Sequence, residues 1–386
     1  MSSRRRARSI VSIRPPASAS DGHVLWPQGP KKGREALKIE DLDTPVPLVD
    51  LAIVDANLKR MQDYCDDHGI ALRPHIKTHK SVKLAERQLA LGAKGISCQK
   101  LGEAEVMVGA GIEDILISYP LIGPIKARRL AALARRAKMS VAIDSRAALE
   151  TVASAARMAD ADIGVLVEFD SGLGRTGVVT VAEALALAQK VGETPHLSFD
   201  GLMTYPASEA SVAFVKRARD AFAAAGLAIP KVSGGGTPNA FRTHEFGVID
   251  ELRVGTYLYN DRMMMGVGHA ELKDCAFDVL VTVVSRPTPD RAIIDAGTKS
   301  LTSDPAGKGG SGHGLIREYP DAVIERLTEE HGMVDLSTSA KKPEIGERLR
   351  VIPNHVCPVS NLHDSIFVLE NGGVSEWRVD ARGMTR

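Results

Sequence analysis

Residues 71–80, ALRPHIKTHK, begin like a β-strand and continue as a run of basic side chains. If the stretch is extended to residue 77, alternation places Arg73, His75 and Lys77 on one face. Three basic groups on one side of a strand repel one another. The stretch therefore needs a negative or electrophilic partner, and we expect an anionic aldehyde in that role.

Short β-branched runs alternate with helical segments on both sides of this stretch. The predicted helical segments are residues 54–69, 125–137, 145–159 and 208–226. The predicted strands are residues 47–52, 71–77, 95–99, 114–120, 140–144, 164–170, 199–206 and 231–236, with a further short one at 251–258. This alternation predicts an α/β fold, a parallel (β/α)8 TIM-like barrel. A doubly wound open sheet is the alternative, because periodicity does not reveal closure.

The pattern changes after about residue 265, where strand-like segments follow one another with Pro, Gly and Asp between them. This indicates a second, mostly antiparallel β domain. We therefore predict a barrel at 41–265, a β domain at 266–386, and a partly disordered N-terminal extension at 1–40. The extension is rich in Arg and Ser and its first 20 residues lack acids, so a targeting signal is its alternative.

Composition excludes several classes of partner. The formal net charge is +1 with 25% charged residues, which argues against nucleic acid as a partner. The apolar runs are shorter than a membrane span, so no membrane partner is expected. The four cysteines form no CxxC pair, which is typical of a reducing compartment and indicates a cytoplasmic protein.

Chemically notable side chains follow the predicted strands, where (β/α)8 barrels carry their chemistry. They are Lys77, Gln99, Arg175, Tyr205 and the turn Ser233, Gly234, Gly235, Gly236 and Thr237. Successive glycines before a helix can cradle a phosphate with backbone N–H groups, although an ordinary Gly-rich turn is about as common. A lysine crowded by basic neighbours has a lowered pKa and can form a Schiff base. The alternative for Lys77 is a solvated surface lysine, as we expect for Lys80.

A phosphate cradle and an activated lysine in one barrel indicate pyridoxal 5'-phosphate (PLP). A third motif, PNHVCPVSNLHD at 353–364, holds His355 and Cys357 two residues apart. On an extended strand both side chains project to one side and could bind one metal ion with open positions. A buried Cys beside a hydrogen-bonded His is the commoner reason for an isolated HxC pair.

Taken together, these residues resemble the D-threonine aldolase and D-serine dehydratase family of fold type III PLP enzymes, which have an alanine racemase-like N-terminal barrel. The resemblance runs from residue 44 to residue 383. It is carried by RPHIKTHK, CQKLGEAEVMVGAGI, LVEFDSGLGRTGV, GLMTYP, SGGGTP, ELRVGTYLYND, IIDAGTKS, EEHG and PNHVCPVSNLHD. It implies a PLP-binding barrel followed by a β domain, paired head to tail as a homodimer.

The resemblance also implies roles for single residues. Lys77 matches the Schiff-base lysine, Arg175 the arginine near the phenolic oxygen of PLP, and Tyr205 the tyrosine at the pyridine nitrogen. The turn from Ser233 to Thr237 matches the phosphate site, as does Tyr257, and Gln99 lines the same pocket. His355 and Cys357 match the metal pair.

The implied activity is that of a metal-activated PLP lyase, which cleaves D-threonine and related β-hydroxy-D-amino acids to glycine and an aldehyde. Mn²⁺ is favoured by the resemblance, while the thiolate ligand favours Zn²⁺, and Mg²⁺ is a further option. Some relatives carry a histidine beyond the barrel tyrosine as a base, but YPASEASVAF here has none. Either metal-bound water, His75 or His79 then takes that role beside Lys77, or the protein belongs to a distinct subgroup.

Three other functions are compatible with parts of the pattern. A D-serine or 3-hydroxy-D-aspartate dehydratase, or an aldolase for the latter, would use the same side chains. A non-catalytic PLP carrier would be a single barrel, which the additional β domain argues against. A racemase would need a tyrosine base from the second domain, and no convincing one is present.

Overall fold

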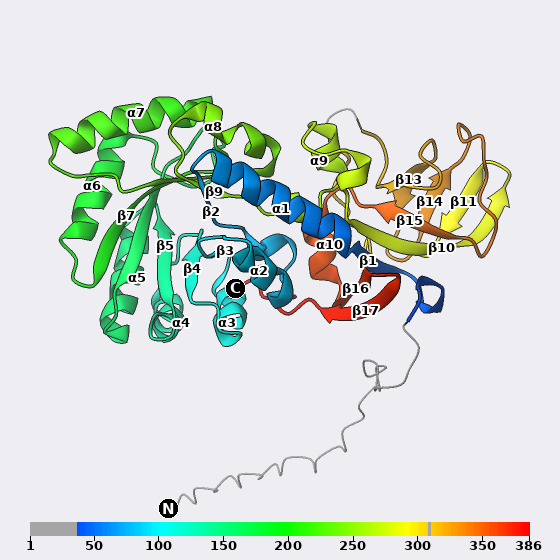
Figure 1. The fold of residues 1–386 in the computed structure, drawn as a ribbon, viewed down its shortest axis with the longest axis horizontal. Coiled ribbons are helices and arrows are strands. Elements are labelled where there is room, and N and C mark those ends of the chain that lie inside the picture. Colours follow the sequence, from blue (N-terminus) through cyan, green and yellow to red (C-terminus); the bar gives the residue numbers. More distant parts are fainter. Residues whose placement is uncertain (1–36, 308–309) are drawn as a thin grey trace, which may run out of the picture. The chain divides into compact units, whose positions relative to one another are not determined.

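A computed structural model describes residues 37–307 and 310–386, which contain two β-sheets (Figure 1). The predicted N-terminal extension lies outside the described residues up to residue 36. One sheet is entirely parallel and the other is mostly antiparallel. This confirms the predicted fold class.

The parallel sheet has eight strands in the order β2-β9-β8-β7-β6-β5-β4-β3. The strands are β2 (Ala71–Leu72), β3 (Ile96–Cys98), β4 (Asp114–Ile117), β5 (Lys138–Ile143), β6 (Ile163–Glu168), β7 (Leu197–Met203), β8 (Val232–Gly235) and β9 (Glu251–Arg253). The two ends of this order also meet, since Ser97 N donates to Pro74 O at 2.7 Å and His75 forms a parallel bridge with Ser97. The sheet is therefore a closed barrel rather than an open doubly wound sheet.

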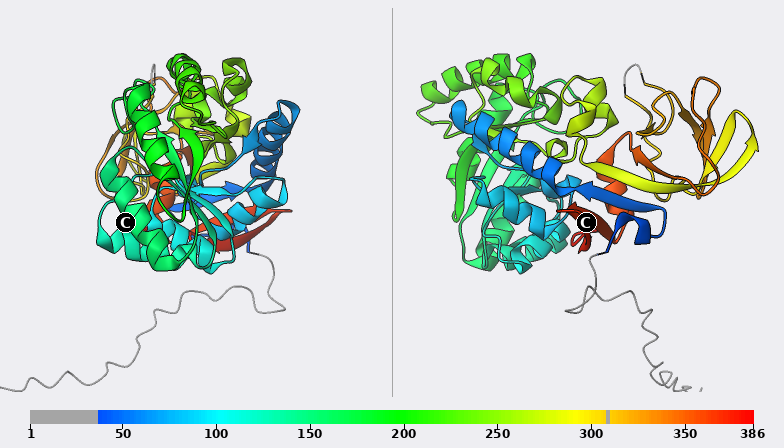
Figure 2. Two further views of the ribbon diagram at one scale, coloured as in Figure 1. Left: turned by 90° about the vertical axis from the view of Figure 1, so that its left-hand side faces the viewer. Right: turned by 45° about the vertical axis from the view of Figure 1, so that its right-hand side comes forward.

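Helices cover the outside of the barrel, as both views in Figure 2 show. They are α2 (Val82–Ala90), α3 (Leu101–Gly109), α4 (Pro124–Ala134), α5 (Arg146–Ala159), α6 (Val181–Gly192), α7 (Glu209–Ala224) and α8 (Thr243–Phe246). Alternate strand residues pack against these helices. The residues between them in β4 to β7 point inward and form a small apolar layer of Leu116, Ala142, Leu166 and Met203.

The second sheet has the path β13-β14-β11-β10-β1-β16-β17, with β15 pairing with β10 and β12. Its strands are β1 (Val46–Asp50), β10 (Phe277–Thr288), β11 (Arg291–Ile294), β12 (Leu315–Ile316), β13 (Val323–Leu327), β14 (Gly332–Asp335), β15 (Arg348–Ile352), β16 (Ser365–Glu370) and β17 (Gly373–Arg378). Only the pairing of β1 with β16 is parallel among the described strands of this sheet.

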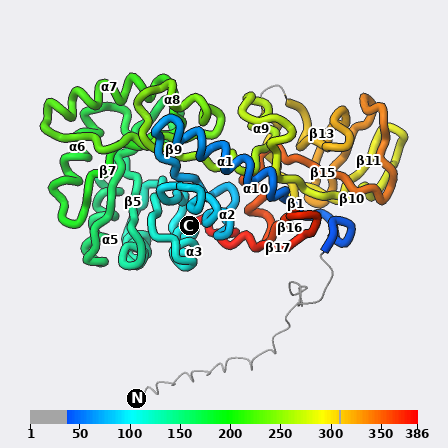
Figure 3. The backbone as a smooth tube through the Cα atoms, in the orientation of Figure 1, coloured from blue at the N-terminus to red at the C-terminus, as the bar shows by residue number. Residues whose placement is uncertain are grey.

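Strand β1 corrects one prediction. We predicted residues 47–52 as the first barrel strand, but β1 lies in the second sheet between β10 and β16. Helix α1 (Leu51–Asp67) then carries the chain to the barrel, as the trace in Figure 3 shows. The eighth barrel strand is instead β9, which we predicted only as an additional short strand. An apolar run of this length fits either sheet. Its pairing with Phe277–Leu280 places it in the second sheet.

Residues 37–386 form one compact unit, so the domain boundary at residue 265 stays a prediction, as does the homodimer. Two short helices complete the second part of the chain, α9 (Arg262–Gly266) and α10 (Val356–Leu362). Within the described residues, no helix combines the length and apolar character needed to cross a bilayer.

Charged side chains fill the barrel interior where β2, β9 and β8 meet. Leu72 and Leu252 belong to the core outside the barrel, so their neighbours Arg73 and Glu251 point inward. Arg73 Nε donates to Glu251 Oε2 at 2.9 Å, and its Nη1 donates to Asp114 Oδ1 at 2.6 Å. Lys231 Nζ also donates to Glu251 Oε2 at 3.0 Å.

These contacts correct the predicted partner of the basic stretch. Arg73 is neutralised by Glu251 and Asp114 rather than by a bound anion. Strand β2 also ends at Leu72 instead of residue 77, since Ile76–Thr78 form a 3-10 helix, η2. The buried carboxylate of Glu251 therefore stabilises this sector of the barrel.

We predict that Glu251→Gln lowers the free energy of unfolding by about 3 kcal/mol at neutral pH, because Arg73 and Lys231 lose a buried partner. Burial raises the pKa of Glu251, but Arg73 and Lys231 outweigh burial and lower it from 4.5 to about 2. A carboxyl group whose pKa is lowered by folding stabilises above its unfolded value. The wild type should therefore lose this contribution as the pH falls from about 4.5 towards 2.

Urea unfolding at neutral and acidic pH measures both effects. The matched control is Glu245→Gln, which removes an exposed ion pair with Arg242 and should leave the unfolding curve unchanged. Equal stability of the Glu251→Gln protein and the wild type at neutral pH would contradict the assigned role.

Candidate active site

Lys77 lies in η2, directly after the chain leaves β2. Burial lowers the pKa of its ammonium group, and the charges of Arg175 and Arg253 lower it further, while Cys357 and Glu103 oppose them. The predicted lowering of the Lys77 pKa thus has a different cause from the one expected from sequence, which was Arg73 and His75. The amine is more available as a nucleophile than that of an ordinary lysine.

Tyr205 brings Lys77 and Arg175 together. It follows β7, and its ring centroid lies 5.9 Å from Lys77 Nζ and 4.9 Å from Arg175 Cζ. Arg175 comes from the loop between β6 and α6. Three side chains from three different strand ends therefore meet at the mouth of the barrel, as expected from their positions in the sequence.

The Gly-rich turn lies against the same tyrosine. A Cβ atom at Gly235 would be 3.3 Å from the Tyr205 ring and 2.8 Å from Arg253 O, so only glycine allows this approach. Gly236 has φ +126° and precedes the 3-10 helix η3 (Thr237–Arg242). Positive φ at this position also requires glycine.

Two predicted phosphate ligands have their hydroxyl groups engaged elsewhere. Ser233 Oγ donates to Glu251 Oε1 at 2.8 Å and accepts from Arg253 Nε at 2.9 Å, inside the barrel. Tyr257 is buried, and its hydroxyl accepts a hydrogen bond from Gln88 Nε2 at 2.9 Å. Burial raises the pKa of Tyr257. The N–H group of Gly236 is engaged as well, since it donates to Arg253 O at 3.2 Å.

His75 is held as a neutral imidazole. Its Nδ1 accepts from Lys77 N at 3.3 Å, and its Nε2 lies 3.1 Å from both Gln99 Oε1 and Ser118 Oγ. Burial lowers its pKa well below 6.5, and Lys77 and Arg253 lower it further. His75 and Gln99 thus lie in one hydrogen-bonded group beside Lys77.

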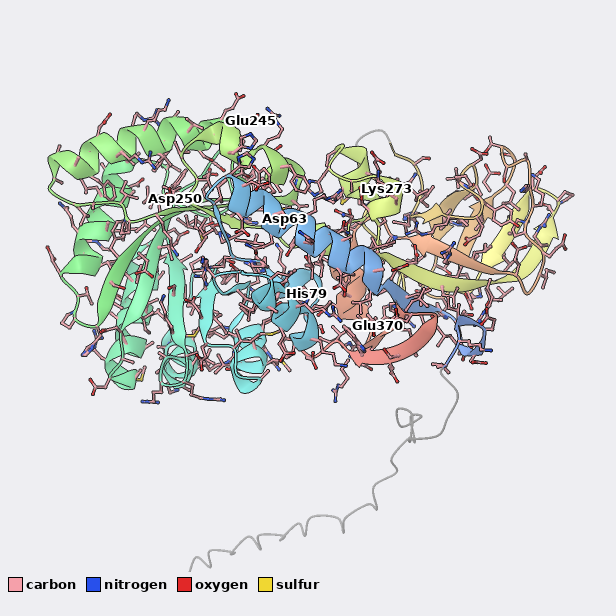
Figure 4. All side chains as sticks on the ribbon, in the orientation of Figure 1. Asp63, His79, Glu245, Asp250, Lys273 and Glu370 are labelled. Atoms are coloured by element: carbon pink, nitrogen blue, oxygen red, sulfur yellow. The ribbon has the colours of Figure 1, made fainter. Side chains whose placement is uncertain are left out.

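His79, labelled in Figure 4, is fully buried. Its Nδ1 accepts from Ser81 N at 3.1 Å, and burial lowers its pKa to about 3. Within residues 37–307 and 310–386, no hydrogen bond joins it to Lys77. Its neighbour Lys80 corrects another expectation, because it is buried and paired with Glu103 at 2.6 Å rather than solvated.

The prediction that His355 and Cys357 lie on an extended strand is wrong. Strand β15 ends at Ile352, His355 is the N-cap of α10, and Cys357 is in its first turn. The side chains still act on each other. Burial lowers the pKa of His355, but Cys357 and Asp304 outweigh it and raise the pKa to about 9. Burial raises the pKa of Cys357, but His355 and Thr78 reverse this and lower it below 9.0.

Thr78 connects this pair with the lysine. It follows Lys77 in η2, it is fully buried, and its Oγ1 lies 3.2 Å from Cys357 Sγ. A Cβ atom at Gly255 would lie 2.7 Å from the same hydroxyl, so glycine there makes room for the contact. The amine of Lys77 and the His–Cys pair therefore belong to one site.

Three residues near the site escaped the sequence analysis. Arg253 and Glu168 are buried at the ends of β9 and β6 and influence each other's pKa. Asp304 Oδ2 lies 2.6 Å from His355 Nδ1. Arg253 and Glu168 could have been found from the sequence, because each is a charged residue at the end of an apolar strand, in ELRVG and GVLVEFD. Asp304 had no such signal.

Comparisons with known proteins agree with this geometry. Residues 49–263 match the family described as "Alanine racemase, N-terminal domain", and residues 276–369 match "Putative serine dehydratase domain". The chain is similar to a D-threonine aldolase of an Arthrobacter species, with 41% identity over 89% of this chain and 94% of the relative. A 3-hydroxy-D-aspartate aldolase of Paracoccus denitrificans is 32% identical over 89% of this chain and 93% of the relative.

Solved structures show the same likeness. The D-threonine aldolase of Filomicrobium marinum has a TM-score of 0.81 and 34% identity over 92% of this chain and 99% of that one. A D-threo-3-hydroxyaspartate dehydratase, solved as a Cys-to-Ala mutant in the metal-free form, has a TM-score of 0.79 and 30% identity over 88% of this chain and 98% of that one.

We predict that Cys357 is the most reactive thiol in protein treated with EDTA. Its lowered pKa increases the fraction of thiolate, whereas burial raises the pKa of Cys65 and Cys275 to about 12 and that of Cys98 well above 9.0. Iodoacetamide should label Cys357 at least about tenfold faster than the others, as measured by peptide mass spectrometry. His355→Ala should slow only that reaction. Equal labelling of all four thiols would contradict the lowered pKa of Cys357.

Proposed function

Because the chain belongs to the D-threonine aldolase and D-serine dehydratase family, we propose that it is a metal-activated, PLP-dependent lyase. Its substrates would be D-threonine and related β-hydroxy-D-amino acids, cleaved to glycine and an aldehyde. The observation that carries this proposal is the joining of Lys77 to the His355–Cys357 pair through Thr78. A reactive amine and a pair of metal donors then act on one substrate.

The residues present fit PLP. Lys77 offers an amine with a lowered pKa, Tyr205 and Arg175 lie beside it, and the glycine turn approaches Tyr205 closely. When bound, PLP supplies an electron sink for the bond that breaks at Cα. Lys77 would be the covalent attachment point, and the end of the glycine turn, where η3 begins at Thr237, would hold the phosphate.

Arg175 and Tyr205 position the cofactor ring from the strand ends that carry them. By family resemblance, Arg175 serves the phenolic oxygen and Tyr205 the pyridine nitrogen. A tyrosine carries no positive charge, so Tyr205 would leave the ring less electron-withdrawing than a cationic partner would. More of the catalysis then depends on the metal site.

The metal site is supported by the chemistry of its donors. An imidazole nitrogen and a thiolate are ligands of divalent transition metals, and two protein ligands leave positions open for substrate. The ion would act as a Lewis acid towards the β-hydroxyl group. The thiolate favours Zn²⁺, whereas the resemblance to metal-activated aldolases favours Mn²⁺, and Mg²⁺ remains an option.

The hydrogen bonds of the two histidines disfavour both as the base for the β-hydroxyl proton. The Nδ1 lone pair of His75 accepts from Lys77 N, and that of His79 accepts from Ser81 N. A neutral imidazole has only one such lone pair. We therefore assign His75 and His79 to positioning the residues around Lys77. The base that accepts the β-hydroxyl proton would then be Lys77 or metal-bound water.

A dehydratase is the second candidate. A D-threo-3-hydroxyaspartate dehydratase from a Delftia species is 32% identical over 87% of this chain and 97% of the relative. The same side chains would serve that reaction, with Lys77 removing the α-proton while the metal assists loss of the hydroxyl group. The products distinguish the two reactions, because an aldolase releases acetaldehyde and glycine from D-threonine.

We predict that purified protein with PLP and Mn²⁺ forms acetaldehyde and glycine in equal amounts from D-threonine, and little pyruvate from D-serine. EDTA should remove most of this activity, because the β-hydroxyl group loses its Lewis acid. Added divalent ion should restore it. Product assays by coupled dehydrogenases measure both aldehyde and pyruvate.

Variants test the ligands in the same assay. His355→Ala should behave like the chelated enzyme and not respond to added metal, while His196→Ala, at an exposed position, should respond like the wild type. Cys357→Asp should remain active with Mn²⁺, because a carboxylate suits a harder ion. Full activity of verified metal-free protein would contradict the metal mechanism, and pyruvate as the main product would favour the dehydratase.

A further inference from the structure

We propose that Asp304 is a positioning residue that holds the imidazole of His355 with Nε2 directed at the bound metal ion. This inference rests on the proposed metal site, and it adds a residue that neither the sequence motif nor the family resemblance contains. Asp304 lies 51 positions before His355 in the chain, in the segment after β11.

The contact between the two side chains determines which imidazole nitrogen is free. Asp304 Oδ2 lies 2.6 Å from His355 Nδ1. An ionised carboxylate only accepts hydrogen bonds, so Nδ1 must carry the proton and donate it. Nε2 then keeps its lone pair for a metal. Metal-binding histidines commonly have such a carboxylate partner, which fixes the tautomer and the orientation of the ring.

Asp304 is itself held by the residue next to His355. Asn354 is fully buried, and its Nδ2 donates to Asp304 O at 3.0 Å and to Gly312 O at 2.9 Å. Its Oδ1 accepts from Arg262 Nη1 at 3.2 Å. Asp304 N donates to Thr302 Oγ1 at 3.0 Å. The segment that carries the carboxylate is thus bound to the backbone that carries the ligand.

A purely structural role for the contact is less well supported. The side chains of Asp304 and His355 are 39% and 33% exposed. Ion pairs that are this open to water contribute little to folding stability. If Asp304 acts on the metal ligand, its loss should weaken metal binding much more than it weakens the fold.

The experiment compares Asp304→Ala and Asp304→Asn with the wild type and with Asp335→Asn. Asp335 accepts hydrogen bonds from Ser337 in a turn of the second sheet and serves as the matched control. Protein stripped of metal is titrated with Zn²⁺ against a chromophoric chelator, and thermal unfolding of the same samples tests the fold. We expect about 10–100-fold weaker Zn²⁺ binding for Asp304→Ala, a smaller loss for Asp304→Asn, and no change for the control.

A second readout examines the imidazole directly. In zinc-loaded wild type labelled with ¹⁵N-histidine, His355 should show a protonated Nδ1 and a metal-bound Nε2, with His355→Ala providing the assignment. Zinc bound through Nδ1, or equal Zn²⁺ affinity of the Asp304→Ala protein and the wild type, would overturn the role of Asp304. Absence of Zn²⁺ and Mn²⁺ binding by the wild type would overturn the proposed metal site and this inference with it.

Discussion

Buried carboxylates decide which basic side chains of residues 73–80 remain available for chemistry. Glu251 pairs with Arg73 at 2.9 Å and Glu103 pairs with Lys80 at 2.6 Å, each between buried side chains. Within residues 37–307 and 310–386, no carboxylate forms an ion pair with Lys77. Burial lowers the pKa of Lys77, and the charges of Arg175 and Arg253 lower it further, while Cys357 and Glu103 oppose them. The carboxylates therefore neutralise Arg73 and Lys80, whereas Lys77 keeps a lowered pKa.

The same carboxylates also position the site. Glu103 uses its second oxygen to accept from Gln99 N at 2.7 Å, so one side chain joins the segment after η2 to the end of β3. Glu251 binds Ser233 Oγ, which accepts from Arg253 and so links β8 with β9. Thr78 then extends this arrangement to Cys357 in α10. The same buried carboxylates thus neutralise charges inside the barrel and fix the geometry at its mouth.

The sequence predicted the features that local pattern controls. The strand–helix alternation identified the barrel, and the positions of Lys77, Arg175 and Tyr205 after their strands brought them together. Features that depend on long-range pairing were missed. Residues 47–52 were placed in the wrong sheet, because their partners lie more than 200 residues away. Lys80 was predicted to be solvated because the sequence does not show that Glu103 faces it. The start of α10 between His355 and Cys357 was also missed, and both residues were predicted to be extended.

Reductive trapping of the cofactor identifies the lysine that charge pairing leaves available, which we infer to be Lys77. The protein is loaded with PLP, reduced with borohydride, digested, and searched by mass spectrometry for the modified lysine. We predict that the label is found on Lys77, with none on Lys80. A label on Lys80 or on another lysine would contradict it.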